Sequence, residues 1–365
     1  MSKQSFLIPE SEIHDHLLRF IDDSNVSIEK LTNFLNNLNL RNNKDELREI
    51  LGMILNISEY HHRHSLFFDK IKQIFAYLKE DIKSAFTNYE IYEIFQDSKI
   101  ILLILLTDQI IKIDDSIFKN ILYKDIFYQC FFYPELKSFL NEEERKVIEQ
   151  RILETDSEAF NNFNEKRQKG ENEKHIYSLI RDDSIKEFVN YVNRTNFNLK
   201  SFTNDSIFET NRFLYKNIDI IKYAAFFGSI KIFLYLQNKG LEVNQSIWNF
   251  AIHGNNPKLI YFLENEFGTE LERKNNIIRE AIKCHHNQIA DYLCNSYDYG
   301  ESDSIFSTCF EFYNFSFLHN FPIKYYFFYA CGYNHLTIVK FLLKNHSDID
   351  VNETIIIRHF FSYKN

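Results

Sequence analysis

Two short motifs in the sequence gather side chains that could bind a metal ion. One is the HHRH segment His61–His64, and the other is the CHH segment Cys284–His286, which Cys294 follows ten residues after Cys284. Imidazole and thiolate groups are the common protein ligands of zinc. Adjacent residues on a helix point about 100° apart, and neither motif completes a ligand set at the usual spacing. We therefore interpret the first motif as a surface or helix-end feature, and the second as a turn between two helices.

Motifs of the common enzyme classes are absent from the sequence. It contains no P-loop, no GxGxxG, no HExxH and no GxSxG, and its eight scattered glycines argue against a loop that cradles phosphate. We predict that the protein is not an enzyme and that it has no catalytic residue, no cofactor and no metal site. The alternative is an enzyme or a metal-dependent module in the N-terminal helical half, supported only by the histidines of His61–His64.

Composition favours a folded helical protein. Hydrophobic residues make up 45% of the 365 positions and aromatic residues 16%, whereas only 8 Gly and 4 Pro are present, fewer than a chain of many tight turns needs. A net charge of −9 argues against nucleic acid as a partner. The most apolar run, Ile100–Leu106, is far shorter than the roughly 20 residues of a membrane span, so no membrane is expected. Five cysteines suit reduced thiols, and we expect a cytoplasmic protein.

A repeated pattern organises the second half of the chain. Four segments, beginning at Tyr223, Phe250, Glu280 and Tyr329, align without internal gaps. In each segment an alanine is followed twelve residues later by a leucine. The alanines are Ala224, Ala251, Ala281 and Ala330, and the leucines are Leu236, Leu263, Leu293 and Leu342. A small residue lets two helices pack closely and a leucine completes an apolar stripe, so each segment predicts two short helices joined by a tight turn.

These segments resemble ankyrin repeats. The resemblance rests on the A-A-x-x-G core of Ala224–Gly228, on the aliphatic run that follows it, and on the connectors Gly240–Asn244 and Asp348–Asn352. The Thr-Pro-Leu-His signature is replaced in every segment, for example by Asp219–Lys222, and the alanines are 27, 30 and 49 residues apart where ankyrin repeats have a period of about 33. The histidine that ties neighbouring ankyrin loops together is therefore absent.

A wider resemblance covers most of the chain. The strings EKRQKGEN at Glu165–Asn172, SIFETN at Ser206–Asn211 and IKCHHNQIADYL at Ile282–Leu293 are similar to a divergent ankyrin family that is expanded in parasitic protists such as trichomonads. Members of that family carry an N-terminal domain of unknown function. The resemblance implies a fold and not an activity.

The N-terminal half shows apolar residues at helical spacing over 28–38, 47–54 and 67–78. The stretch Ser98–Leu105 also echoes the second helix of the later repeats. We predict an all-α fold, a helical-repeat solenoid in which degenerate ankyrin repeats of the C-terminal half stack on an N-terminal array of helix pairs. The expected domains are 1–175 and 176–365. Repeat units are expected near 176–198, 219–245, 246–272, 276–297, 303–321 and 325–352, with a partial unit at 354–365.

Solenoids bind proteins along a concave surface and at their hairpin tips. The predicted function is therefore a non-catalytic scaffold or adaptor that binds an unknown protein partner. We nominate Glu242, Asn244 and Asn352 at the tips, and Asn249 and His253 on the exposed face of a first helix.

The final segment Thr354–Phe361 reads as the first helix of another repeat without its second helix. Solenoid ends normally require a polar cap. We expect Ile355, Ile356 and Phe360 to form an apolar end that docks a partner or a second copy of the chain. The alternative is that the chain is a truncated family member.

Overall fold

A computed structural model of the chain describes residues 8–38, 40–201, 206–214, 218–268, 274–297, 303–318, 323–347 and 349. The regular elements of these residues are α-helices and three short 3-10 helices, which confirms the predicted all-α class. By their internal contacts, the described residues fall into two compact units. Unit 1 contains the residues up to Asp81 and those from Glu264 onward, and unit 2 contains Ile82–Leu263.

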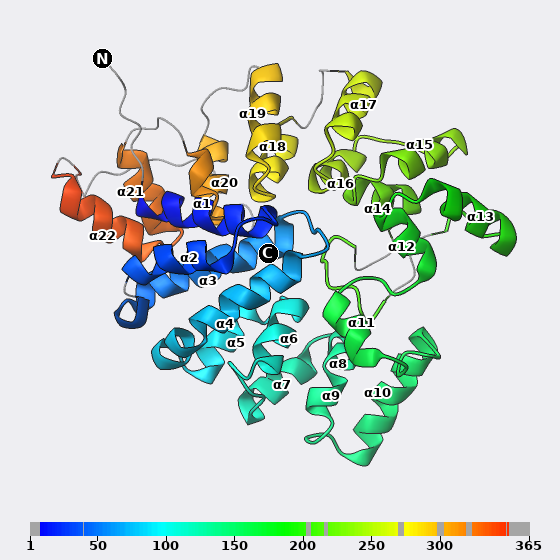
Figure 1. Cartoon of the computed structure of the whole chain (residues 1–365), viewed down its shortest axis with the longest axis horizontal. Helices are drawn as coiled ribbons and strands as arrows, with labels where there is room; N and C mark the ends of the chain where they lie inside the picture. The colour runs from blue at the N-terminus through cyan, green and yellow to red at the C-terminus, as the bar shows by residue number, and fades with distance from the viewer. Residues whose placement is uncertain are drawn as a thin grey trace. The chain divides into compact units, whose positions relative to one another are not determined.

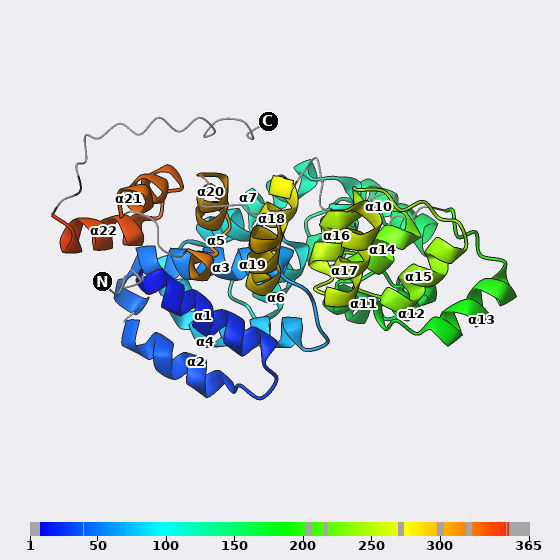
Figure 2. The ribbon, with the colours of Figure 1, turned by 90° about the horizontal axis from the view of Figure 1, so that it is seen from above.

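Unit 1 combines the first helices of the chain with the last (Figures 1 and 2). Its elements are α1 Pro9–Asp22, α2 Ile28–Leu35, η1 Asn36–Leu38, η2 Leu40–Asn42, α3 Lys44–Tyr60, most of α4 Phe67–Ala85, α18 Lys274–Lys283, α19 Asn287–Ser296, α20 Asp303–Glu311, η3 Phe315–Phe317, α21 Ile323–Gly332 and α22 Leu336–Asn345.

Unit 2 holds the helices in between. Its elements are α5 Asn88–Phe95, α6 Lys99–Thr107, α7 Asp115–Tyr123, α8 Ile126–Phe131, α9 Tyr133–Leu136, α10 Glu142–Thr155, α11 Phe163–Lys169, α12 His175–Arg181, α13 Ile185–Thr195, α14 Ile220–Phe226, α15 Ile230–Asn238, α16 Ile247–His253 and most of α17 Pro257–Phe267. Among the residues that the structure describes, no helix is both long and apolar enough to cross a membrane.

Local sequence features explain where helices of the N-terminal half begin and which face they bury. Thr87 starts α5 with a capping box, in which its hydroxyl accepts from the amide of Glu90 and the Glu90 carboxylate accepts from the amide of Thr87. The apolar stripe of α3, from Leu47 to Ile54, is fully buried. Burial of such a stripe stabilises short helices that would be marginal alone.

The predicted echo between α6 and the later second helices appears in the backbone. After each of α6, α13 and α15, one residue adopts a left-handed conformation, and the next amide donates to a carbonyl five residues earlier. The left-handed residues are Gln109, Asn196 and Gly240, and the bonds are Ile110 to Leu105, Phe197 to Val192 and Leu241 to Leu236. Only glycine adopts this conformation without a steric cost.

Within unit 1, α1 and α3 pack against the last repeats. Helix α1 contacts η3, and the Ser11 hydroxyl donates to the carbonyl of Phe315 at 3.2 Å. Helix α3 contacts α22. Within unit 2, α14 packs on both α15 and α16, and α12 packs on α13 and α14. The repeat helices in each unit therefore stack on their sequence neighbours, as in a solenoid.

Candidate functional site

Five of the turns that join the two helices of a repeat share one backbone geometry. A residue with positive φ follows the first helix, and the next amide donates over 2.8–3.0 Å to the carbonyl at the alanine position. This bond runs from Ser184 to Leu179, Ser229 to Ala224, His286 to Ala281, Asn314 to Cys309 and His335 to Ala330. The expected units near 176–198 and 303–321 thus contain the same turn, although Leu179 and Cys309 replace the alanine.

In three repeats, a polar side chain at the start of the second helix ties the repeat to the one before it. The Ser229 hydroxyl donates to the carbonyl of Ile180, and the Asn314 amide donates to that of Ile282 at 2.7 Å. Nε2 of His335 lies 2.8 Å from the carbonyl of Phe310. Each acceptor directly follows the alanine-equivalent position of the preceding repeat.

These ties were missed by the sequence analysis. Ser229 matches the position of an N-cap residue, and it does precede α15, but its side chain makes no capping bond to its own helix. The hydroxyl serves the neighbouring repeat instead. The signal that could have found the ties is the polar side chain repeated at this position, which includes His286 and His335.

The nominated partner-binding residues of unit 2 have different surroundings. Glu242 and Asn244 are exposed on the connector between α15 and α16, and Asn249 is exposed on α16. His253 is only 1% exposed, so its placement on the exposed face was wrong. Its ring stacks on Phe226 at 4.9 Å and lies 4.3 Å from Phe213, because this face of α16 packs against α14.

The nominated residues near the C-terminus cannot be placed. Asn352, Ile355, Ile356 and Phe360 lie outside the residues that the structure describes. The expectation of an apolar end therefore stays a prediction.

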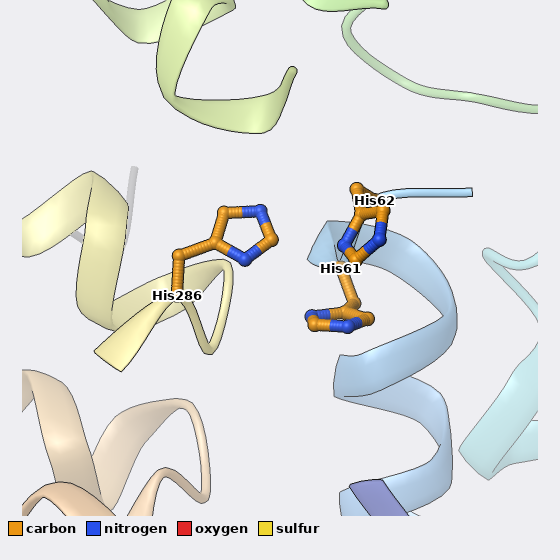
Figure 3. A group of neighbouring side chains, drawn as sticks. All are labelled: His61, His62 and His286. Carbon is orange, nitrogen blue, oxygen red and sulfur yellow. The ribbon is translucent and has the colours of Figure 1, made fainter. Parts of the chain in front are cut away.

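In unit 1 the structure brings together the two histidine motifs that the sequence analysis treated separately. His61 caps the C-terminal end of α3 and His62 follows it, whereas His286 precedes α19. Their rings turn toward one another in Figure 3, with centroids 4.5 Å apart for His61 and His62, 5.0 Å for His61 and His286, and 5.2 Å for His62 and His286. We call these three residues the histidine cluster.

His61 is the best anchored member of the histidine cluster. Its Nδ1 lies 2.8 Å from the carbonyl of Cys284, and its Nε2 lies 2.8 Å from Oδ1 of Asp22. Burial disfavours the ionised form of Asp22, but the hydrogen bond from His61 and the nearby imidazoles outweigh it and lower the pKa of Asp22. The helix-end position predicted for this motif is confirmed, but a surface position is wrong for His61, which is 4% exposed.

The ring of His62 is less well hydrogen-bonded than that of His61. Among the described residues, its Nδ1 is buried without a hydrogen-bond partner. Such a group costs about 1–3 kcal/mol relative to a satisfied one. Burial, together with the neighbouring His61, lowers the pKa of His62 to about 4, so the ring is neutral near pH 7 and Nδ1 can offer a lone pair.

Two further histidines lie beside the histidine cluster. His285, in the left-handed position of the α18–α19 turn, has its Nδ1 2.8 Å from Nε2 of His14, whose Nδ1 is 3.0 Å from the Ser316 hydroxyl. Both rings are buried, which lowers the pKa of His14 to about 3 and that of His285 well below its usual value. The turn predicted for Cys284–His286 is confirmed.

Comparison with known proteins supports the repeat architecture. The ankyrin repeat family matches residues 323–352. This chain is an all-α helical-repeat protein with an ankyrin-like segment. The match spans α21 and α22, including Ala330 and Leu342 of the repeated pattern. No curated protein and no solved structure matches the chain. Ankyrin repeats are modules that bind proteins, so the segment points to a protein-interaction role.

The pKa values of the cysteines are shifted away from those of an activated thiol nucleophile. Burial raises the pKa of Cys130 to about 12 and that of Cys294 to about 11, and it raises the pKa values of Cys284, Cys309 and Cys331 as well. Reactive thiols require the opposite shift, because the thiolate is the nucleophile. Cys284 takes part in the site through its backbone carbonyl, which contacts Nδ1 of His61.

Proposed function

We propose that the chain is a non-catalytic scaffold or adaptor that binds a protein partner at the hairpin tips and along the concave surface of its ankyrin-like repeats. The observation that carries this proposal is the connector between α15 and α16. Glu242 and Asn244 are exposed on it, and it leads directly to the exposed Asn249. In ankyrin-like solenoids, tips and inner helices of this kind form extended binding surfaces.

The connector is ordered by its own hydrogen bonds. The amide of Leu241 donates to the carbonyl of Leu236 at 3.2 Å, which fixes the exit from α15. Oδ1 of Asn244 accepts from the amide and the hydroxyl of Ser246, at 3.0 and 2.6 Å, which fixes the entry to α16. A tip that is already ordered loses little conformational freedom on binding. We therefore assign Asn244 to shaping the tip, and Glu242 and Asn249 to direct contact with the partner.

The alternative of an enzyme or metal-dependent module in the N-terminal half has one structural feature in its favour, the histidine cluster with His61 and His62. The raised pKa values of the thiols argue against cysteine nucleophile chemistry. The non-catalytic interpretation is therefore preferred for the chain as a whole.

Other parts of the proposal rest on the sequence. They are membership of the divergent protist family, the division into domains 1–175 and 176–365, a cytoplasmic location and self-association through the segment with Ile355, Ile356 and Phe360. The net charge of −9 favours a protein partner over nucleic acid.

Site-specific photo-cross-linking of the full chain tests the proposed surface. A photoreactive amino acid at Asn249 or Glu242 should give one defined cross-linked protein from cell lysate. The control position is Lys258, which is exposed on α17. Equal products from all three positions, or no product at Asn249 and Glu242, would contradict the proposal.

A further inference from the structure

Three imidazole rings from distant parts of the sequence meet in unit 1. His61 and His62 come from the end of α3, and His286 comes from the start of α19. Each can offer one ring nitrogen, and these nitrogens all lie within 4.8 Å of one another (Figure 3). Nitrogens bound to one tetrahedral zinc ion at 2.0–2.1 Å are about 3.4 Å apart. Closing the set requires side-chain movements of roughly 1.5 Å at most, within the reach of small torsional changes.

We propose that His61, His62 and His286 form a binding site for a divalent metal ion of the zinc class. The site would link α3 to the turn between α18 and α19 within unit 1. Its role would be structural, because the ion would join two segments of unit 1 that are far apart in the sequence. The site is independent of the proposed partner surface on unit 2.

The surroundings of His61 fit this role. A histidine that ligates a metal usually donates its other ring N–H to a carbonyl or carboxylate, which fixes the orientation of the ring. Nδ1 of His61 has such a partner in the carbonyl of Cys284 at 2.8 Å, so Nε2 is the nitrogen that would bind the ion.

Asp22 lies beside the three histidines and contacts one of them, His61. Its Oδ1 lies 2.8 Å from Nε2 of His61, so these two atoms now share a proton. Binding of an ion at Nε2 would displace this proton, and the Asp22 carboxylate would then offset part of the charge of the ion. The Asp22 side chain is 41% exposed, compared with 3% for His61, so an ion can reach the site from solvent on this side.

His62 supplies the observation that a purely structural interpretation leaves unexplained. Its buried Nδ1 has no hydrogen-bond partner among the described residues, and its ring faces those of His61 and His286. A buried nitrogen without a protein partner is well placed to bind a water molecule or an ion. A metal ligand is the role that satisfies Nδ1 of His62 and accounts for the convergence of the three rings.

His64, the other histidine of the HHRH segment, is not a ligand. Its Nε2 lies 3.0 Å from the carbonyl of Ile21, and its Nδ1 accepts from the amide of Leu66 at 3.3 Å. Both ring nitrogens thus help to hold the loop that presents His62.

The ligand types indicate zinc rather than calcium or magnesium. Imidazole suits zinc, copper, iron and nickel, whereas magnesium and calcium prefer oxygen ligands. No thiol is part of the set, since Cys284 contributes its carbonyl. Copper(II) would bind any such site more tightly than zinc does, so the decisive probe is zinc itself.

The test uses the full chain after removal of metal by a chelator. Titration with Zn²⁺ against a chromophoric chelator should show one ion per chain. His62→Gln and His286→Gln should each weaken binding at least about 100-fold, and Asp22→Asn by about 10-fold. His16→Gln, in which a histidine of α1 outside the cluster is replaced, and Cys331→Ser, in which an exposed thiol is removed, should stay within about threefold of the unmodified chain.

The circular dichroism spectrum of each variant reports whether it has kept its helices. A measurement that needs no variant is X-ray absorption of the zinc-loaded chain, which should show nitrogen and oxygen neighbours at about 2.0–2.2 Å and no sulfur at about 2.3 Å. Binding of zinc that survives His62→Gln or His286→Gln, a sulfur neighbour, or no zinc binding would each overturn the proposal.

Discussion

The turns between the paired repeat helices have the same backbone in the two units but present different side chains. In unit 2 the left-handed position holds Asp183, Gly228 and Asn255, which are short side chains or none. In unit 1 it holds His285, Tyr313 and Asn334. Gly228 is required where it stands, because a Cβ there would lie 2.5 Å from the carbonyl oxygen of Gly254 in the next repeat. The turns of unit 2 thus pack on one another.

The rings in the turns of unit 1 contact the N-terminal helices of the same unit. For residues other than glycine, asparagine and aspartate, the left-handed backbone conformation is costly. His285 and Tyr313 adopt it, and each ring meets an N-terminal helix, His285 at His14 of α1 and Tyr313 at Gly52 of α3. The comparison teaches that one repeat geometry can serve two purposes, stacking of repeats in unit 2 and attachment of α1 and α3 in unit 1.

The largest loss of stability is expected from breaking the buried pair of Glu49 and His335, which attaches α3 to α22. Nδ1 of His335 lies 2.8 Å from the Glu49 carboxylate, and both side chains are almost fully buried. His335→Ala leaves that carboxylate buried and unpaired, so the free energy of unfolding should fall by about 3–5 kcal/mol. Urea denaturation measures the change.

The matched control joins the same two helices at the surface. Lys340 lies 2.6 Å from Asp45, but both side chains are exposed. Lys340→Ala should therefore change stability by less than about 1 kcal/mol. Similar losses in the two variants would contradict the importance of burial.

The second prediction concerns Glu10, which is 3% exposed on α1. Burial, with the nearby charges of Glu49 and Glu46, raises its pKa to about 7 from 4.5. The folded state thus holds this proton more tightly than the unfolded state. The contribution of Glu10 to stability is complete below pH 4.5 and is lost as pH rises to about 7, a change of about 3 kcal/mol.

Glu10→Gln should remove this loss and stabilise the chain at pH 8. His14, whose pKa is lowered to about 3, has the opposite pH dependence, with stability lost as pH falls below 6.5, so the difference between variant and unmodified chain is the useful quantity. The control is Glu12→Gln, an exposed position on the same helix. Urea denaturation at several pH values from 4.5 to 8 measures the free energy of unfolding. Parallel pH profiles for the unmodified chain and for Glu10→Gln would contradict the prediction.

The third prediction tests the contact between Tyr313 and α3. Replacing glycine by alanine inside a helix normally stabilises it by about 1 kcal/mol. At Gly52 the new Cβ would lie 2.6 Å from the Tyr313 ring, so Gly52→Ala should instead destabilise unit 1 by about 1–3 kcal/mol. The double variant with Tyr313→Leu should lose less than the sum of the two single losses. Stabilisation by Gly52→Ala would show that the contact yields without cost.

The smallest loss of stability is expected in unit 2, at the hydrogen bond between Ser229 and Ile180. Ser229→Ala removes the hydrogen bond to the carbonyl of Ile180 and should cost about 1 kcal/mol. Ser184 occupies the same position in the preceding repeat, and its hydroxyl forms no hydrogen bond with the described residues. Ser184→Ala should change the urea midpoint much less. Equal shifts would mean that the inter-repeat bond contributes nothing measurable.

Much of the fold could be predicted from local patterns. Helical spacing located α2, α3 and α4, and the alanine-to-leucine interval located the four best repeats, because both patterns arise within about 15 residues. The same reasoning failed at His253, since one face of a short helix can turn either outward or onto a neighbour.

The candidate metal site could not be predicted because its members are far apart in the sequence. His61 and His286 were each explained adequately by their own segment, one as a helix end and the other as a turn. Only the packing of α3 near the α18–α19 turn makes them one group. Periodicity cannot report contacts of this kind.

The attachment of α1 to the last repeats also sets an order of events during synthesis. Ser11 and its acceptor Phe315 are 304 residues apart in the chain. At about 5–20 residues per second, the ribosome exposes α1 for roughly 15–60 s before its docking surface exists. During that interval α1 can pack on α2 and α3, whereas the part of its surface that meets η3 stays exposed to solvent.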